Sequence, residues 1–255
     1  MINNIRRVIT VAVVGVLLAA GSMTLFAQQP QQARQQGQPQ AWPTVANREV
    51  RPPQSWEEDI KKFEAADKQN PPPQNAIVFI GSSSIVRWDL TKYFSELGPK
   101  AINRGFGGTV AADATYYADR IVAPYKPAIV VYYSGDNDVE TPTTSEQIAT
   151  EFIKFEQKVH KAVPNAKIIF ISIKPSLRRW AFQDKMTKAN AMVKSHISTG
   201  RNMVYLDVVP KMLGADGKPK PELFVQDGLH MTPAGYDIWT AALKPLLTTG
   251  TGTRN

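Results

Sequence analysis

Five short runs of apolar, largely β-branched residues constrain the fold of this chain more than any other feature. The predicted strands are residues 76–80, 100–103, 128–133, 167–173 and 203–208. Near-continuous apolar runs of this length are typical of strands that are covered on both faces, as in parallel sheets. Because longer segments with helical periodicity separate the runs, the sequence predicts a doubly wound, three-layer α/β/α sandwich.

The segments between these runs carry helix signals. Residues 144–147 fit a capping box, which marks the start of a helix. Thr232 followed by Pro233 is also a typical helix start, and it predicts a last helix through Leu246. A short helix is expected at residues 56–68. Two segments carry apolar stripes at helical spacing, namely Ile148, Phe152, Phe155 and Val159, and Met186, Ala189, Val193 and Ile197.

The N-terminal residues read as an export segment. Arg6 and Arg7 precede an uncharged, mainly apolar stretch at residues 8–27, which is typical of a signal peptide cleaved after Ala27. The stretch also has the ~20 residues needed to span a bilayer, so an uncleaved anchor is the alternative. Either way the rest of the chain is expected outside the cytoplasm, periplasmic or secreted. It would contact a membrane only through an uncleaved anchor.

Composition changes again after the apolar stretch. Residues 28–53 are rich in Gln and Pro and lack apolar periodicity, so they are expected to form a flexible linker. The predicted organisation is a signal or anchor at 1–27, this linker, one folded domain at 54–248 and a disordered tail at 249–255.

Several function classes are excluded by residue counts. The chain has no cysteine, which removes disulfides, thiolate metal sites, iron–sulfur clusters and a cysteine nucleophile. It has 30 Lys and Arg against 22 Asp and Glu, a net charge of +8. No basic stripe with interleaved aromatic residues accompanies that charge, so nucleic acid is not an expected partner.

Polar residues gather where the predicted strands end. Gly-Ser-Ser-Ser follows the first strand at 81–84, Gly-Phe-Gly-Gly the second at 105–108, and Gly-Asp-Asn-Asp the third at 135–138. Asp-Gly-Leu-His lies beyond the fifth strand at 227–230. Each motif alone is an ordinary helix cap or turn. Because the carboxyl ends of parallel strands meet at one edge of a sheet, the four motifs are expected to face one crevice.

Together these motifs contain the groups that acyl transfer needs. A serine hydroxyl becomes a nucleophile when a neutral imidazole accepts its proton, and the imidazole needs an acceptor on its other nitrogen. His230 and Asp227 are three residues apart, so one turn can bring the carboxylate to the ring. Backbone N–H groups of Ser83 and Gly108 and the side-chain amide of Asn137 supply donors for an oxyanion.

The segments IVFIGSSSIVRW, NRGFGG, YYSGDND and DGLHMTPAGY resemble the four blocks of the SGNH (GDSL-like) hydrolase superfamily. In style the chain is similar to bacterial exported esterases of the platelet-activating-factor acetylhydrolase type. The resemblance extends over residues 56–247 and implies a five-stranded parallel, flavodoxin-like sheet. It implies that Ser83 is the nucleophile, that Asp227 and His230 complete the triad, and that Gly108 and Asn137 complete the oxyanion hole.

The sequence departs from that family at one position. The first block is usually Gly-Asp-Ser, and Ser82 stands here where the family has Asp. That Asp is not a triad member, so catalysis is not excluded, but the hydrogen bonding that supports the nucleophile turn must differ. The mechanism requires no metal and no organic cofactor.

Four further residues are candidates for substrate binding. Trp88 could line the acyl or sugar pocket, or anchor the core. Arg104 could contact an anionic substrate, or pair with Asp136 or Asp138. Lys174 and Trp180, with Arg178 and Arg179, could form a basic rim that suits a glycan, or simply a solvated helix start.

The expected function is a serine esterase that cleaves carboxylic esters of a small molecule or a glycan. Short acyl groups such as acetate are favoured because the loops after the middle strands predict an open, shallow site. An envelope O-acyltransferase with the same site is one alternative. A non-catalytic glycan-binding module is the other.

Overall fold

The computed structural model describes residues 47–247. The predicted signal or anchor, residues 28–46 of the predicted linker and the tail at 249–255 lie outside the described residues. Among the helices of residues 47–247, none is long and apolar enough to cross a membrane. The description below concerns only this part of the chain.

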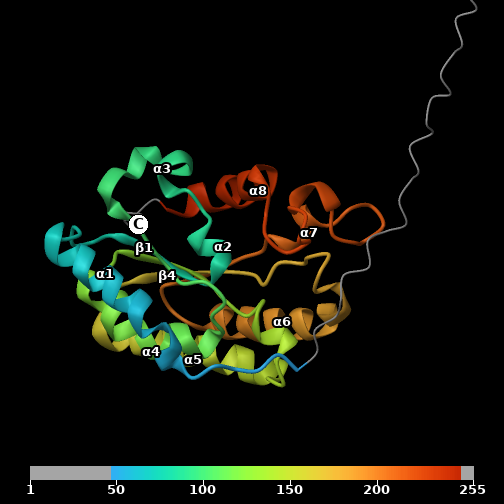
Figure 1. Cartoon of the computed structure of the whole chain (residues 1–255), viewed down its shortest axis with the longest axis horizontal. Coiled ribbons are helices and arrows are strands. Elements are labelled where there is room, and N and C mark those ends of the chain that lie inside the picture. Colours follow the sequence, from blue (N-terminus) through green and yellow to red (C-terminus); the bar gives the residue numbers. More distant parts are fainter. Residues whose placement is uncertain (1–46, 248–255) are drawn as a thin grey trace, which may run out of the picture. The chain divides into compact units, whose positions relative to one another are not determined.

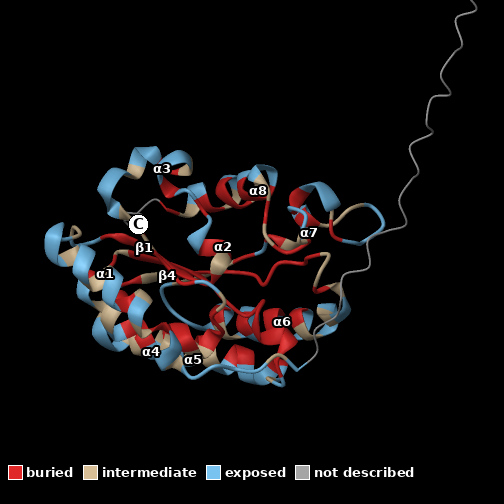
Figure 2. Cartoon of the chain, viewed as in Figure 1, coloured by how far each residue is buried: buried red, intermediate tan, exposed pale blue. Residues whose placement is uncertain are grey.

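The core of the fold is a five-stranded sheet. Its strands are β1 (Ile77–Gly81), β2 (Ala101–Gly105), β3 (Ile129–Tyr133), β4 (Lys167–Ile171) and β5 (Met203–Leu206). They lie in the order β2-β1-β3-β4-β5, and every neighbouring pair is parallel. Every residue of β1 and β3 is buried, as the continuous apolar runs predict (Figure 2). The predicted fold class, including the flavodoxin-like strand order, is therefore confirmed.

Helices cover both faces of the sheet (Figure 1). One face carries α1 (Glu57–Gln69), α4 (Ala111–Ile121), α5 (Ser145–Ala162) and α6 (Gln183–Thr199). The other face carries the short helices α2 (Ser83–Val86), α3 (Leu90–Tyr93) and α7 (Val209–Met212), together with α8 (Pro233–Leu243). Because successive side chains of a strand point to opposite faces, each strand contributes to two separate apolar cores. In β1, Val78 and Ile80 enter the first core, and Ile77 and Phe79 the second.

The predicted helix signals act as expected at α5. The Thr144 hydroxyl accepts the Gln147 backbone N–H at 3.2 Å, and the Gln147 side chain accepts the Thr144 N–H at 2.7 Å. This capping box satisfies two donors that would otherwise lack partners at the helix start. The stripes predicted on α5 and α6 are buried against the sheet. Helix α8 begins at Pro233 as predicted but ends at Leu243, where a 3-10 turn follows.

Trp88 belongs to the core and not to a substrate pocket. Its side chain is 1% exposed, and its indole N–H donates to the Thr240 hydroxyl at 3.2 Å. The rings of Phe79, Phe94, Tyr236 and Trp239 surround it at centroid distances of 5.4–5.9 Å. The substrate-binding prediction for Trp88 is therefore wrong, and the alternative of a core anchor holds.

Arg104 is also structural. It is buried on β2, where its guanidinium pairs with Asp67 of α1 and its Nε donates to the Tyr125 hydroxyl at 2.7 Å. Arg104 therefore does not pair with Asp136 or Asp138, and its guanidinium is occupied by Asp67, Tyr125 and the Asn103 carbonyl instead of facing a substrate. The sequence could not indicate this outcome because the partner, Asp67, comes from a helix that precedes the sheet.

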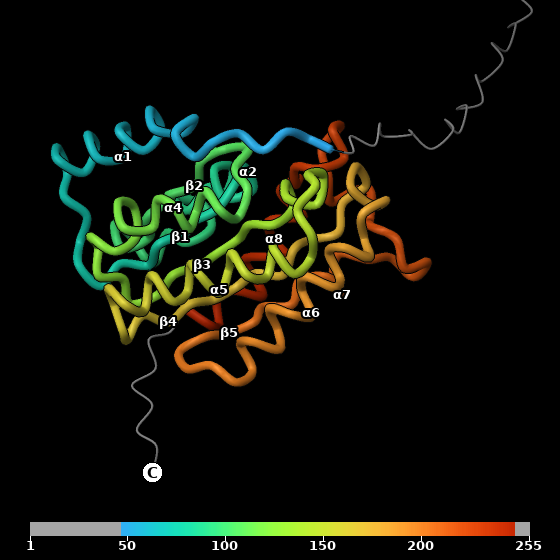
Figure 3. Tube along the Cα trace, turned by 90° about the horizontal axis from the view of Figure 1, so that it is seen from below, coloured from blue at the N-terminus to red at the C-terminus, as the bar shows by residue number. Residues whose placement is uncertain are grey.

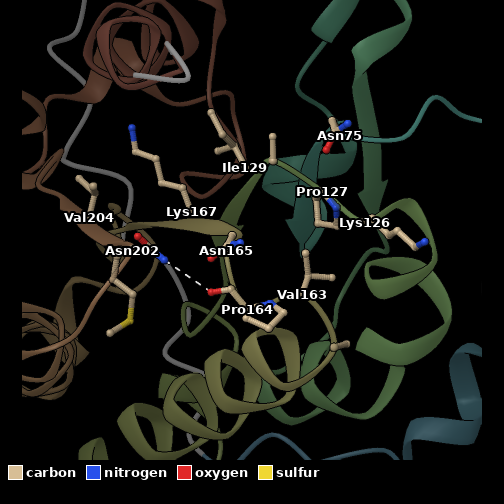
Figure 4. A pocket seen from close by; sticks show the side chains of 13 residues that line it. Asn75, Lys126, Pro127, Ile129, Val163, Pro164, Asn165, Lys167, Asn202 and Val204 are labelled. Carbon is tan, nitrogen blue, oxygen red and sulfur yellow. Dashed lines mark hydrogen bonds between the residues drawn. The ribbon is translucent and has the colours of Figure 1, made fainter. Parts of the chain in front are cut away.

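A surface cavity of about 670 Å³ lies at the amino ends of β3, β4 and β5 (Figure 4). Lys126, Asn165 and Asn202 are among its lining residues, and Asn202 donates to the Pro164 carbonyl at 3.5 Å. The lining contains no carboxylate, imidazole or hydroxyl side chain. Because it lies at the amino ends of the strands, the cavity is at the opposite end of the sheet from the strand-end motifs, which follow the carboxyl ends.

The burial of Trp88 makes a stability prediction. Replacing Trp88 with Ala should lower the free energy of unfolding by about 3–5 kcal/mol, because the core loses a large buried ring and keeps a cavity. Urea unfolding followed by circular dichroism measures this change. A loss below about 1 kcal/mol, as expected for a ring on a pocket wall, would contradict the core assignment.

Candidate active site

Three strand-end turns leave the sheet at one level. Gly81 is the register partner of both Gly105 on β2 and Tyr133 on β3. Gly81 has φ +151°, and a Cβ atom at this position would collide with the Tyr133 carbonyl. Glycine therefore allows the chain to pass close to β3 just before it turns into α2. As a result, the residues after β1, β2 and β3 start next to one another.

Ser83, His230 and Asp227 form a continuous hydrogen-bonded chain. Ser83 is the first residue of α2, and its Oγ lies 2.9 Å from His230 Nε2. The other ring nitrogen, Nδ1, lies 2.5 Å from Asp227 Oδ2. The imidazole is 15% exposed, so it can be reached from solvent while its orientation is held on both sides. The structure thus brings together the three residues that the sequence proposed as a triad.

Asp227 is held in place by its own loop. Its Oδ1 accepts the backbone N–H groups of Leu229 and His230, both at 2.9 Å. Partial burial raises the pKa of Asp227, but the hydrogen bonds from His230 and Leu229 outweigh that effect and leave the pKa below its ordinary value. The carboxylate is therefore ionised at neutral pH and can stabilise a positive imidazole ring.

The predicted oxyanion donors lie beside the serine. A Cβ atom on Gly107 would be only 3.9 Å from the Ser83 Cβ, so the turn after β2 reaches Ser83. Gly108 has φ +80°, a conformation that favours glycine. Within residues 47–247, neither the Ser83 N–H nor the Gly108 N–H donates to another protein group. Both donors are free to bind an oxyanion.

Asn137 is the third predicted donor, and it is 3% exposed. Its Nδ2 donates to the Thr109 carbonyl at 2.8 Å, which uses one of its two amide hydrogens. Its Oδ1 accepts from Arg48 at 3.0 Å and from Arg179 at 2.9 Å. The amide is therefore held on both sides, and one N–H remains.

Sequence reasoning missed Arg48 entirely. The residue falls in the segment predicted as a flexible linker, yet residues 47–53 lie against the turns after β2 and β3 (Figure 3). Composition carried no signal for this contact, because the surrounding stretch is rich in Gln and Pro. The folded part of the chain thus begins before the predicted boundary at residue 54.

Lys174 does not form an exposed rim. Its side chain is 0% exposed, and its ammonium donates to Asp136 at 2.7 Å, to the Tyr133 hydroxyl at 3.1 Å and to the Ser84 hydroxyl at 3.3 Å. Burial raises the pKa of Asp136, but Lys174 and Arg179 overcome this and lower it below its ordinary value. The substrate-binding prediction for Lys174 is wrong because its ammonium is buried in an ion pair with Asp136, which follows the neighbouring strand β3.

The Asp136 carboxylate also contacts the turn that carries Ser83. Its Oδ1 accepts from the Ser82 hydroxyl at 3.4 Å. Ser82 stands where the first sequence block usually has Asp. In this chain a carboxylate therefore reaches the nucleophile turn from the end of β3.

Arg179 and Trp180 differ in burial. Arg179 is 3% exposed and donates to Glu140 at 2.9 Å, so it is not part of a solvated helix start. Trp180 is half-buried and lines a cavity of about 180 Å³ with Met186 and Leu213, among others. A substrate contact for Trp180 stays a prediction.

Asp138 is a buried carboxyl group next to this site. Both of its oxygens lie near the Ala111 backbone N–H, at 3.0 and 3.1 Å, at the start of α4. Burial raises the pKa of Asp138 to about 7, although that hydrogen bond opposes the change.

Comparison with known proteins places the chain among hydrolases. Residues 86–238 match the model of the GDSL-like lipase/acylhydrolase family, a match that begins just after Ser83. No curated protein matches the chain by sequence.

Solved structures share the fold at low identity. A Streptococcus pneumonia protein, provisionally named a platelet activating factor, is 22% identical with a TM-score of 0.68, covering 76% of this chain and 94% of that one. A GDSL-like lipase from Bacteroides thetaiotaomicron is 21% identical with a TM-score of 0.65, covering 74% and 96%. A mutant acetyl-xylooligosaccharide esterase from Geobacillus Stearmophilus is 17% identical with a TM-score of 0.56, covering 69% and 96%.

The raised pKa of Asp138 predicts a pH-dependent stability. Folding holds the Asp138 proton up to about pH 7, whereas the unfolded chain releases it near pH 4, so the unfolding free energy falls as pH rises through this window. Asp138→Asn removes this effect, and the variant should gain stability relative to the native chain between pH 4 and 7.

Urea unfolding of both proteins at several pH values measures the difference. Asp237→Asn, at an exposed position on α8, is the matched control and should show no such trend. A difference between Asp138→Asn and the native chain that is constant from pH 4 to 8 would contradict the prediction.

Proposed function

The chain belongs to the GDSL-like lipase/acylhydrolase family and is an ester-hydrolysing enzyme; on that premise, we propose that it is a serine esterase with Ser83 as nucleophile. The observation that carries the proposal is the distance of 2.9 Å between Ser83 Oγ and His230 Nε2. At this distance the imidazole can accept the hydroxyl proton as the oxygen attacks.

The reaction proceeds in two halves. Ser83 Oγ attacks the ester carbonyl carbon, its proton passes to His230 Nε2, and the leaving alcohol then takes that proton as its bond to carbon breaks. In the second half, water gives a proton to His230 and attacks the acyl-enzyme, which releases the carboxylic acid and returns the proton to Ser83. Asp227 holds the ring through Nδ1 and stabilises its positive charge in both halves.

The oxyanion forms where three donors meet. Negative charge develops on the carbonyl oxygen, and the Ser83 N–H, the Gly108 N–H and the free amide hydrogen of Asn137 are the donors that this proposal assigns to it. Such preorganised donors act strongly because they need no reorientation during the reaction.

The proposed substrates are esters with short acyl groups, acetate above all, on a small molecule or a sugar. The partial exposure of His230 and Asp227 supports an open site. Two neighbours of the same fold are named as an acetyl-xylooligosaccharide esterase and a carbohydrate esterase of family 3. Export from the cytoplasm, predicted from residues 1–27, remains part of the proposal.

Removing the proposed nucleophile gives the first test. Ser83→Ala should reduce turnover of an acetate ester by about 10⁶-fold, as in other enzymes with a catalytic triad. The same variant should no longer react with a fluorophosphonate probe. Ser195→Ala, at an exposed position on α6, is the control and should keep both properties. Continued labelling of Ser83→Ala would reject the nucleophile assignment.

A series of p-nitrophenyl esters from acetate to palmitate tests the acyl-chain proposal. The value of kcat/KM should be highest for acetate and fall steadily with chain length, because the proposed open, shallow site would bury little of a long chain. Acetylated sugars run beside the series, with and without an added sugar acceptor, separate hydrolysis from acyl transfer. A preference for palmitate would overturn the short-acyl proposal.

A further inference from the structure

Arg48 reaches both of the backbone turns that carry the proposed oxyanion donors. Its Nη2 donates to the Gly108 carbonyl at 2.8 Å, and its Nη1 donates to Asn137 Oδ1 at 3.0 Å. Its own backbone N–H donates to the Glu140 carbonyl at 2.8 Å, which attaches the segment to the turn after β3. One side chain therefore links the turn after β2, which reaches Ser83, to the turn after β3.

The contact with Arg48 determines which way the Asn137 amide faces. A guanidinium has only donors, so the atom that it meets on Asn137 must be the oxygen. Arg179 also donates to this oxygen, at 2.9 Å, and so favours the same orientation of the Asn137 amide. The amide nitrogen must then point to the other side, where it meets the Thr109 carbonyl at 2.8 Å.

Two positive groups at one oxygen also polarise the amide. Charge-assisted hydrogen bonds are stronger than neutral ones, and they draw electron density from the N–H₂ end, which becomes a better donor. Repulsion between Arg48 and Arg179 is offset by nearby carboxylates. Glu140 accepts from Arg179 at 2.9 Å, and Asp136 lies 3.6 Å from the Arg179 guanidinium.

We propose that Arg48 is a positioning residue for catalysis, which holds the Asn137 amide and the Gly108 turn in the geometry that binds the oxyanion. The inference rests on the proposed esterase function. It assigns a role in the reaction to a residue that precedes the first helix and belongs to none of the four sequence blocks.

The position of Arg48 makes the proposal testable without unfolding the domain. Arg48 is partly buried and lies outside the helices and strands, whereas Arg179 is buried among charged groups. Loss of Arg179 would leave the buried Glu140 carboxylate with only the longer contact to Arg178 at 3.8 Å, which is destabilising. Arg48 is therefore the residue to change.

Steady-state kinetics on p-nitrophenyl acetate give the main test. Arg48→Ala should lower kcat by about 10- to 100-fold with KM within about twofold, a smaller loss than the roughly 10²–10³-fold expected for Asn137→Ala. Arg48→Lys should recover only part of kcat, because one ammonium cannot match the two-pronged contact. Millimolar methylguanidinium should partly restore Arg48→Ala. Arg201→Ala, an exposed arginine before β5, is the matched control and should behave as the native chain.

A double-mutant cycle tests whether Arg48 acts through the amide. If it does, Arg48→Ala should lower kcat much less in the Asn137→Ala variant than in the native chain. Two losses that simply multiply would overturn the proposal. An unchanged kcat in Arg48→Ala, whether or not Tm falls, would also overturn it and leave only a structural role.

An NMR measurement keeps the proposal independent of turnover. The side-chain amide of Asn137, identified by its absence in Asn137→Ala, should give a sharp, slowly exchanging signal pair. Arg48→Ala should shift and broaden that pair, and Arg201→Ala should not. An unaltered pair in Arg48→Ala would reject the positioning role. Ser83→Ala, measured in parallel, separates the two hypotheses, since its retained activity would reject the esterase mechanism and leave this signal unaffected.

Discussion

The register of three parallel strands is the constraint on which the site depends. Gly81 stands opposite both Gly105 and Tyr133, so the chain leaves β1, β2 and β3 at the same height. The close approach of Gly81 to the Tyr133 carbonyl then allows the turn into α2 to start beside the turn that carries Asn137. The hydrogen bonding of the sheet thus makes neighbours of motifs that are far apart in sequence. The loop before α8 then brings His230 to Ser83.

Much of this arrangement could be predicted from sequence, because periodicity records which faces an element buries. The strands, the capped helix α5 and the contact between His230 and Asp227 follow from local spacing. Charged residues were harder to place. Arg104 and Lys174 have carboxylate partners on other elements, and a sequence pattern cannot indicate whether an ion will be buried with its partner. Trp88 presented the same difficulty, since a ring beside a nucleophile turn can face either the core or the ligand.

Arg48 was invisible for a different reason. Its contacts require the chain before α1 to lie across the ends of β2 and β3, and a Gln/Pro-rich composition predicts the opposite. The Arg48 side chain attaches this segment through two carbonyl-type oxygens, each by a charge-assisted hydrogen bond, and its backbone N–H adds a third bond to the Glu140 carbonyl. The composition of a stretch therefore predicts its average tendency to stay unfolded, but not the contacts of a single residue near its end.

The contact between Ser82 and Asp136 limits which residues position 82 can hold. Asp136 already brings a carboxylate to Ser82, and the Lys174 ammonium pairs with that carboxylate at 2.7 Å. An acidic residue at 82 would place a second carboxylate beside Asp136 at a buried position, and repulsion between the two like charges would raise the pKa of one of them despite the nearby Lys174 and Arg179. Positions 82 and 136 are therefore coupled, because the buried space between the ends of β1 and β3 holds one ionised carboxylate at little cost and a second only at a penalty.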